Sequence, residues 1–181
     1  MIKLIDLIKE NEEESEVNID RLYWNDSYSN SIAEKFGYNY DFNKSFWLHP
    51  STLFHCTVPE KYELIKSEGI LKTRSDTRGI NNRSVGSAIF TTMEDTEVES
   101  LRQSYGNIVI EINTIQMKKD GFMPTVSKEP EVERAEQLVF VLNKLGKDTE
   151  IYQLIDSSGG ISEYTIIIYN SIPIKYLSLY D

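Results

Sequence analysis

Three polar features of the sequence have residue types and positions that could serve a ligand or a reaction. His55 lies in the apolar stretch LFHCT, where a predicted strand meets a helix and backbone donors are presented to a ligand. Glu163 stands near the start of ISEYTIIIY, on the same strand face as Thr165. An ionised carboxylate that is buried on such a face needs a compensating partner. The cations between Lys66 and Arg83 form a local excess of positive charge that suits an anionic ligand.

Each of these features also has a plain structural explanation. His55 fits a core histidine in front of a well-capped helix, Glu163 fits the solvated edge of a strand, and the cations fit a solvated loop. The residue pattern alone leaves both explanations open for all three.

The stretch from Leu53 to Leu71 is the element that must position the imidazole. It predicts a short apolar strand that runs into a capped helix. Thr57 is the expected N-cap, Glu60 completes a capping box three residues later, and Gly69 is the expected left-handed C-cap. The stripe of this helix that is expected to be buried consists of Tyr62, Leu64 and Ile65.

The remainder of the chain alternates between strands, helices and loops. After Gly69, LKTRSDTRGINNRSVGS has no periodicity and predicts an exposed loop, of a length that is more often functional than idle. Ala88 to Thr91 predicts a short strand, with Thr92 as the N-cap of the next helix. The other expected elements are helices over 93–105 and 132–145, a loop over 118–130, and strands over 107–113, 150–155, 161–169 and 174–180.

The first 50 residues differ in composition from the rest. Residues 1–16 begin as an amphipathic helix and end in an acidic run that fits a solvated end or linker. Residues 19–50 are rich in Tyr, Trp and Phe, which favours one or two short helices and an aromatic loop. We therefore expect a helical, aromatic-rich extension over 1–50 that packs on a main domain over 51–181; a partner-binding surface is the alternative.

The composition bounds the class of protein. With 181 residues, 40% hydrophobic and 27% charged, the chain fits one globular domain with a small extension. It has no apolar run of 18 residues and no basic-then-apolar start, so we expect a cytoplasmic protein without membrane contact. The only cysteine, Cys56, suits a reducing compartment and argues against a metal site. A net charge of −10 disfavours general nucleic-acid binding.

Three segments, in order, resemble the three motifs of the ADP-ribosyltransferase superfamily. The first is FHCT at 54–57, followed by a helix and EGIL. The second is GSAIFTT at 86–92, followed by a helix, a Tyr-Gly pair and the strand NIVIEI. The third is SEYTIIIYNSIPIKYLSLYD at the C-terminus. The resemblance covers residues 51–181 and leaves the first 50 unexplained.

The resemblance implies an α+β protein with an ADP-ribosyltransferase-like split fold: two small, mainly antiparallel packed sheets with flanking helices and NAD in between. It implies that His55 binds the ribose hydroxyl next to nicotinamide, and that Thr57 meets the nicotinamide amide or the adenosine ribose. Phe90 stands where the family usually has a tyrosine that stacks on nicotinamide, and Thr92 stands at a serine-like position that holds structure or ribose. Glu163 is then the catalytic acid of the third motif.

These residue types fit one reaction. Cleavage of the bond between nicotinamide and ribose passes through an oxocarbenium-like state, which a carboxylate bonded to the 2′-hydroxyl stabilises while it orients the acceptor. No metal is required. The segment from Lys72 to Ser84 lies where the family carries a segment that covers the donor, so Arg74 or Arg78 is expected to pair with the NAD diphosphate.

The first functional hypothesis is an NAD-dependent mono-ADP-ribosyltransferase that modifies a macromolecule and releases nicotinamide, as an effector, toxin or conflict-system protein. The acidic charge favours a protein acceptor over nucleic acid, although a single-stranded nucleobase stays open. One alternative is an NAD glycohydrolase, which uses water as the acceptor. The other is a degenerate family member that binds a nucleotide or a protein without turnover, which the missing hydroxyl at Phe90 keeps open.

Overall fold

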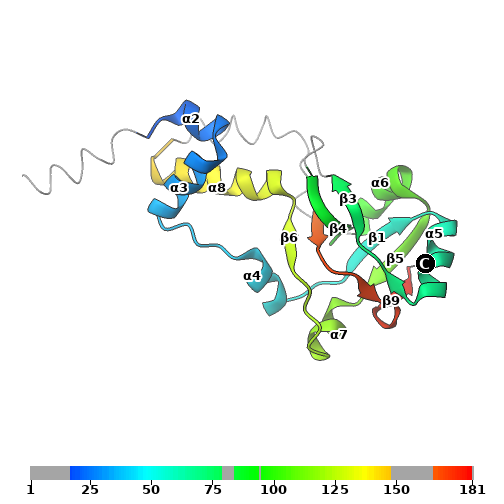
Figure 1. Ribbon diagram of the computed structural model, residues 1–181. Coiled ribbons are helices and arrows are strands. Elements are labelled where there is room, and N and C mark those ends of the chain that lie inside the picture. Colours follow the sequence, from blue (N-terminus) through cyan, green and yellow to red (C-terminus); the bar gives the residue numbers. More distant parts are fainter. Residues whose placement is uncertain (1–16, 79–83, 94, 148–164, 181) are drawn as a thin grey trace, which may run out of the picture. The chain divides into compact units, whose positions relative to one another are not determined.

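The computed structural model shows an α+β protein with an antiparallel sheet and flanking helices (Figure 1). It describes residues 17–78, 84–93, 95–147 and 165–180. The chain divides into two compact units, Met1–Asn39 with Arg134–Gly160, and Tyr40–Glu133 with Ile161–Asp181. None of the helices in the described ranges is long and apolar enough to cross a membrane.

The second unit is built on a seven-stranded antiparallel sheet. Its strands are β1 (Leu53–Thr57), β3 (Arg74–Arg78), β4 (Ser84–Thr92), β5 (Ile108–Ile112), β6 (Val126–Lys128), β7 (Thr165–Ile168) and β9 (Leu177–Leu179). The order across the sheet is β6-β7-β4-β1-β5-β9, and β3 pairs with β4 off this path. A separate two-stranded sheet joins β2 (Ile70–Leu71) to β8 (Ile172–Pro173). The two strands with the first two sequence motifs, β1 and β4, are therefore neighbours at the centre of the sheet.

The larger hydrophobic core lies on one face of this sheet. The helices of the second unit are α4 (Phe42–Leu48), α5 (Pro59–Glu68), α6 (Asp95–Tyr105) and α7 (Thr114–Lys119), with a 3₁₀ turn η3 (Ile174–Tyr176). Leu53 of β1 and Ile110 of β5 are fully buried against Trp47 of α4 and Ile65 of α5. Each fully buried aliphatic side chain contributes about 2 kcal/mol. Because side chains alternate along a strand, His55 shares this face with Leu53.

The opposite face of the sheet packs against α6. Phe54 and Cys56 of β1 form a second cluster with Val109 of β5 and with Val98 and Leu101 of α6. The even-numbered residues of β1 therefore belong to the core beneath α6, whereas the odd-numbered ones face the larger core.

The β6 edge of the sheet is covered by α4. The backbone N–H of Val126 donates to Asn43 Oδ1 at 2.9 Å, and Trp47 Nε1 donates to the Pro124 carbonyl at 3.0 Å. Unpaired edge groups are templates for pairing with other chains, so these bonds protect the strand.

The first unit is a cluster of helices. It contains α2 (Ile19–Trp24), α3 (Asp26–Lys35) and most of α8 (Pro130–Lys144), which begins in the second unit. Its hydrophobic core is built around Leu22, Ala33, Leu138 and Val141. The two short helices begin at asparagines: Asn18 Oδ1 accepts from Arg21 N, and Asn25 Oδ1 accepts from Tyr28 N, both at 2.9 Å.

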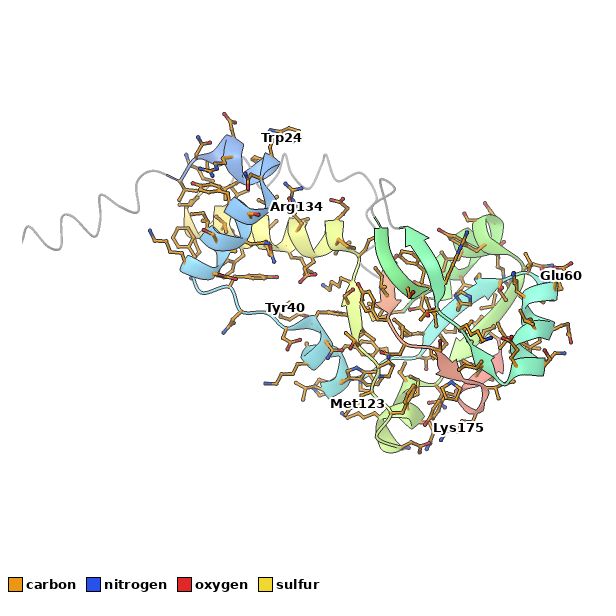
Figure 2. All side chains as sticks on the ribbon, in the orientation of Figure 1. Trp24, Tyr40, Glu60, Met123, Arg134 and Lys175 are labelled. Atoms are coloured by element: carbon orange, nitrogen blue, oxygen red, sulfur yellow. The ribbon has the colours of Figure 1, made fainter. Side chains whose placement is uncertain are left out.

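Arg134 joins α8 to the two short helices of this unit (Figure 2). Its guanidinium donates to the Tyr23 carbonyl, and one nitrogen lies 2.8 Å from the Asp26 carboxylate. The aromatic region that was expected to hold one or two helices thus contributes α2 and α3 here and α4 to the second unit.

The predicted strand and helix around His55 are confirmed, but the predicted N-cap is wrong. Gly69 ends α5 with φ +72°, as expected. The N-cap is Val58, which makes no side-chain capping bond, because Thr57 stays in β1 with its backbone opposite Ile108. Pro59, at the start of α5, sets the helix without a capping box.

The buried stripe of α5 is also narrower than predicted. Ile65 is buried and Tyr62 is partly buried against the larger core. Leu64, which was expected in the stripe, is 46% exposed. The helix therefore rests on the sheet through a single row of side chains.

Two segments predicted as loops contain strands. Arg74–Arg78 forms β3, although its sequence RSDTR has no apolar alternation, and Val126–Lys128 forms β6 inside the loop expected over 118–130. β3 is held by backbone pairing with β4, with register shifts on either side of Thr77. β6 is held by backbone pairing with β7. Hydrophobic periodicity cannot reveal strands that are stabilised in this way.

Two further expectations are corrected and two cannot be compared. Thr92 is the last residue of β4, whereas α6 begins at Asp95, so Thr92 is not a helix N-cap. The strand expected over 174–180 begins with the η3 turn and is shortened to β9. The expected elements over 1–16 and 150–155 lie outside the described residues.

Candidate functional site

The candidate site lies where the pairing between β1 and β4 stops. With β5, β1 pairs at all five of its residues, from Leu53 opposite Ile112 to Thr57 opposite Ile108. With β4, the register among these described residues contains only Phe54 opposite Thr92. The next hydrogen-bonded pair in an uninterrupted antiparallel ladder would be Cys56 with Phe90.

Hydrogen-bond alternation shows which backbone groups face this interruption. The Val109 carbonyl accepts from Tyr180 N at 3.0 Å, so the peptide groups of Val109 face β9 and those of Ile110 face β1. The peptide groups of His55, opposite Ile110, therefore face β5, and those of Cys56 face β4. One N–H and one C=O of Cys56 thus point toward β4 where the registered ladder has ended.

The His55 imidazole takes the place of the missing backbone pair. Its Nδ1 lies 2.8 Å from the Phe90 carbonyl oxygen, and because a carbonyl can only accept, the ring nitrogen donates. Burial lowers the pKa of His55 below its ordinary value, and the bond to Phe90 opposes that shift to a smaller extent. The residue as a whole is half-buried.

The predicted side chains divide between the two faces of the sheet. His55 and Thr57 project from the same face of β1. Thr92, opposite Phe54, projects from the other face, and Phe90 shares that face because it lies two residues away on β4. The structure brings the carbonyl of Phe90 to His55, but it does not bring the Phe90 ring onto the His55 face.

Two of the predicted residues cannot be placed by their side chains. Glu163 lies outside the described residues; the first described residue of β7, Thr165, is opposite Thr92 of β4. Arg78 pairs through its backbone with Ser84, and its side chain is not described.

The cation-rich segment carries less free charge than its sequence indicates. Lys66 lies 2.6 Å from Glu63, and Lys72 lies 2.8 Å from Glu68, each pair along or just beyond α5. Arg74 is exposed on β3, where it pairs with Ala88 and has a further interaction of its own. The predicted anionic site thus depends on arginines rather than on these two lysines.

Cys56 contributes backbone groups rather than a reactive thiol. Its Sγ lies 3.9 Å from the Val98 carbonyl in the core beneath α6. Burial raises the pKa of the Cys56 thiol, an effect that the nearby Arg102 partly opposes. This peptide group and the Phe90 carbonyl could not be selected from the sequence, because backbone groups have no residue-type signature.

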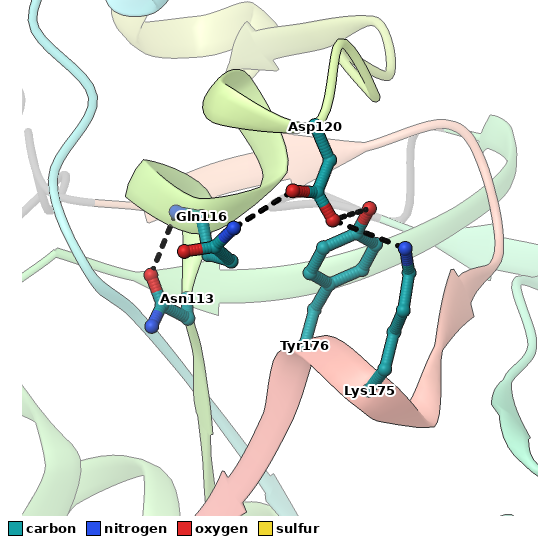
Figure 3. Close-up of polar contacts among 5 residues, drawn as sticks. All are labelled: Asn113, Gln116, Asp120, Lys175 and Tyr176. Atoms are coloured by element: carbon teal, nitrogen blue, oxygen red, sulfur yellow. Dashed lines mark hydrogen bonds and ion pairs between the residues drawn. The ribbon is translucent and has the colours of Figure 1, made fainter.

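A second polar cluster fixes the C-terminal segment (Figure 3). Asp120 accepts from Lys175 Nζ and Tyr176 Oη at 3.0 Å each, and from Gln116 Nε2 at 2.7 Å. The bond from Lys175, followed by those from Gln116 and Tyr176, lowers the pKa of Asp120. Both ends of the cluster are satisfied, so we assign it a structural role that joins α7 to η3.

The described residues contain no group of three or more His, Cys, Asp or Glu side chains that could hold a metal ion. No protein-family model, curated protein or solved structure matches the chain. Function is therefore inferred from the geometry around β1 and β4 and from the sequence motifs.

Proposed function

We propose that the protein is an NAD-dependent mono-ADP-ribosyltransferase of the ADP-ribosyltransferase superfamily, with a protein as the favoured acceptor. One observation carries the proposal: the β1–β4 ladder stops at Phe54, and the His55 imidazole and the Cys56 peptide group face the interruption. The two features lie in the first sequence motif, beside the second motif on β4.

The Cys56 peptide group has the hydrogen-bonding pattern that a carboxamide requires. A primary amide has one acceptor oxygen and an NH₂ donor, so it complements one N–H and one C=O that lie on the same strand edge. In the proposal, nicotinamide binds this edge in the manner of an added strand residue. The ribose hydroxyl next to nicotinamide then binds His55, and Thr57, on the same face, lines the adjoining part of the site.

The proposed reaction exchanges one glycosidic bond for another. The bond between the nicotinamide nitrogen and C1′ of the ribose breaks, and nicotinamide leaves with the electron pair. A nucleophilic atom of the acceptor forms the new bond to C1′ and loses its proton to Glu163 or to solvent. Before that, Glu163 holds the 2′-hydroxyl and stabilises the positive charge that develops on the ribose. Because Thr165 is opposite Thr92 and projects from the face away from His55, this role requires the chain before Thr165 to bring Glu163 round to the His55 side.

The second motif and the β3–β4 region provide the remaining contacts in this proposal. Arg74 and Arg78 pair with the NAD diphosphate, because a guanidinium matches phosphate bidentately. The Phe90 ring projects from the opposite face of the sheet, so Phe90 acts on the site only through its carbonyl, which accepts the hydrogen bond from His55. Thr92 supports β4 through its pairing with Phe54 and Thr165.

The proposal is tested by binding and turnover of NAD on the full chain. We expect calorimetric binding of NAD and release of free nicotinamide in the presence of a cell lysate, with label from the adenylate half on a macromolecule. Deamido-NAD, in which a carboxylate replaces the carboxamide, should bind about tenfold or more weakly, because its oxygen faces the Cys56 carbonyl without a proton. Equal affinity for the two dinucleotides would contradict the assigned role of the Cys56 edge.

Matched variants separate the residues. Glu163→Gln should abolish nicotinamide release, whereas Glu111→Gln should remain active, because Glu111 shares the face of Val109 that packs beneath α6. Arg74→Ala and Arg78→Ala should each weaken NAD binding, and unchanged affinity in both would remove this segment from the site. A fully active Glu163→Gln enzyme would refute the choice of catalytic carboxylate.

A second candidate function has a specific observation in its favour. The ring of Phe90 lies on the face opposite His55, so an aromatic that stacks on nicotinamide is not supplied by this residue. A degenerate member that binds NAD or a related nucleotide without turnover fits this arrangement. Binding of NAD with neither nicotinamide release nor labelled product would select it, and free ADP-ribose without labelled macromolecule would indicate an NAD glycohydrolase.

A further inference from the structure

The hydrogen bond between His55 and Phe90 has a consequence for ligand chemistry. A neutral imidazole has one N–H donor and one acceptor nitrogen, and the hydrogen bond made at one nitrogen determines the role of the other. At His55 the Nδ1 position is occupied by the Phe90 carbonyl at 2.8 Å, an oxygen that can only accept. The proton of the neutral ring is therefore on Nδ1, and Nε2 carries the lone pair.

The surroundings of the ring favour the neutral form over the imidazolium. Across the ladder from His55 on β5 lies Ile110, which is fully buried. On β4 the same face carries Ile89, which is buried, and Thr91, whose hydroxyl donates to the Ile166 carbonyl at 2.8 Å. None of the ion pairs among the described residues involves the His55 ring, so these residues supply no carboxylate that would stabilise an imidazolium there.

We infer that the Phe90 carbonyl is a positioning group that fixes His55 as the Nδ1–H tautomer and leaves Nε2 as a hydrogen-bond acceptor. The ligand group that meets this ring is then a donor, a hydroxyl rather than a phosphate or carboxylate oxygen. This assignment deepens the proposed function, on which its ligand rests, by stating which partner the ring selects. In this tautomer the Nδ1–H of His55 donates to the Phe90 carbonyl as a backbone N–H of a paired strand would, while the ring stays neutral and does not attract anions.

The tautomer is measured without any ligand on the wild-type full chain. In two-bond ¹H–¹⁵N correlation spectra above pH 7, we expect the His55 pattern of a single Nδ1–H tautomer. His49, the only other histidine, is exposed and serves as the internal reference. An Nε2–H tautomer or an imidazolium at His55 under these conditions would overturn the inference, whether or not NAD binds.

Two substitutions then test which nitrogen meets the ligand. His55→Gln places an amide oxygen near the Nε2 position, whereas His55→Asn places it near Nδ1. NAD should bind the Asn variant about three- to tenfold more weakly than the Gln variant, the range that one hydrogen bond is worth. If wild-type chain with the Nδ1–H tautomer binds no NAD, the proposed function fails while the tautomer assignment stands. If the wild type binds NAD but His55→Asn binds it as tightly as His55→Gln or more tightly, the role of Nε2 as the hydrogen-bond acceptor for the ligand is refuted.

Discussion

Replacing Gly106 by alanine should destabilise the second unit more than any other glycine-to-alanine change at a described positive-φ position. Gly106 ends α6 with φ +124°, a conformation that L-residues rarely adopt. A Cβ there would stand 2.5 Å from the carbonyl carbon and oxygen of Thr57 and 2.7 Å from the nitrogen of Val58. All three atoms belong to the backbone, so no side chain can rotate to relieve the overlap.

The expected magnitude has two parts. The unfavourable backbone conformation costs about 1–3 kcal/mol. Forcing the Thr57–Val58 backbone away adds about 1–3 kcal/mol, as for other overpacked sites. The sum of about 2–6 kcal/mol is a large part of the stability of an ordinary domain. The same displacement reaches the end of β1, two residues from His55, so NAD binding should weaken as well.

Gly121→Ala is the matched control in the same unit. Gly121 also has a positive φ, +74°, but nothing lies within 4 Å of the position that a Cβ would take. Gly121→Ala should therefore lower the free energy of unfolding only by the cost of the unfavourable backbone conformation, about 1–2 kcal/mol. Urea titrations followed by fluorescence report on this unit, because Trp47 is buried in it and Trp24 is 88% exposed. Equal losses of stability for the two variants would refute the close approach between Gly106 and Thr57.

Three other predictions concern titratable groups. Cys56, buried and with a raised pKa, should react with a thiol reagent such as iodoacetamide far more slowly in the folded chain than in urea; equal rates would contradict its burial. Asp120→Asn should lower the midpoint of unfolding at pH 7, and the gap should close as pH falls through the lowered folded-state pKa of Asp120, because the wild-type carboxylate then loses its pairing with Lys175. The folded-state pKa of His55 is lowered, so as pH falls the unfolded chain takes up this proton first, and the free energy of unfolding should fall as pH drops below about 6.5. In urea titrations across that range, the free energy of unfolding of His55→Gln should depend less on pH than that of the wild type. An equal dependence on pH in the two proteins would refute the lowered pKa of His55.

The sequence predicts the elements that are stabilised by burial of their own apolar side chains. β1 and the end of α5 at Gly69 follow from an apolar run and a glycine at the C-cap, and α8 follows from apolar residues at helical spacing. The α+β class with an antiparallel sheet is implied by the family resemblance rather than by these elements, and the structure confirms it at that level.

The elements that the sequence does not reveal depend on contacts between distant residues. β3 is a polar strand held by the ladder to β4, and β6 is held by β7 and by Asn43 of α4. The same limit applies to the candidate site. His55 could be selected from its position in an apolar strand, but the interruption of the ladder at Cys56 arises from register between β1 and β4, which no local pattern encodes.

The most direct test of the account is the structure of the full chain in complex with a non-hydrolysable NAD analogue. The account predicts the nicotinamide carboxamide on the peptide N–H and C=O of Cys56, with a ribose hydroxyl on Nε2 of His55. A dinucleotide bound elsewhere, or a Cys56 peptide group paired with Phe90 while the analogue is bound, would contradict it.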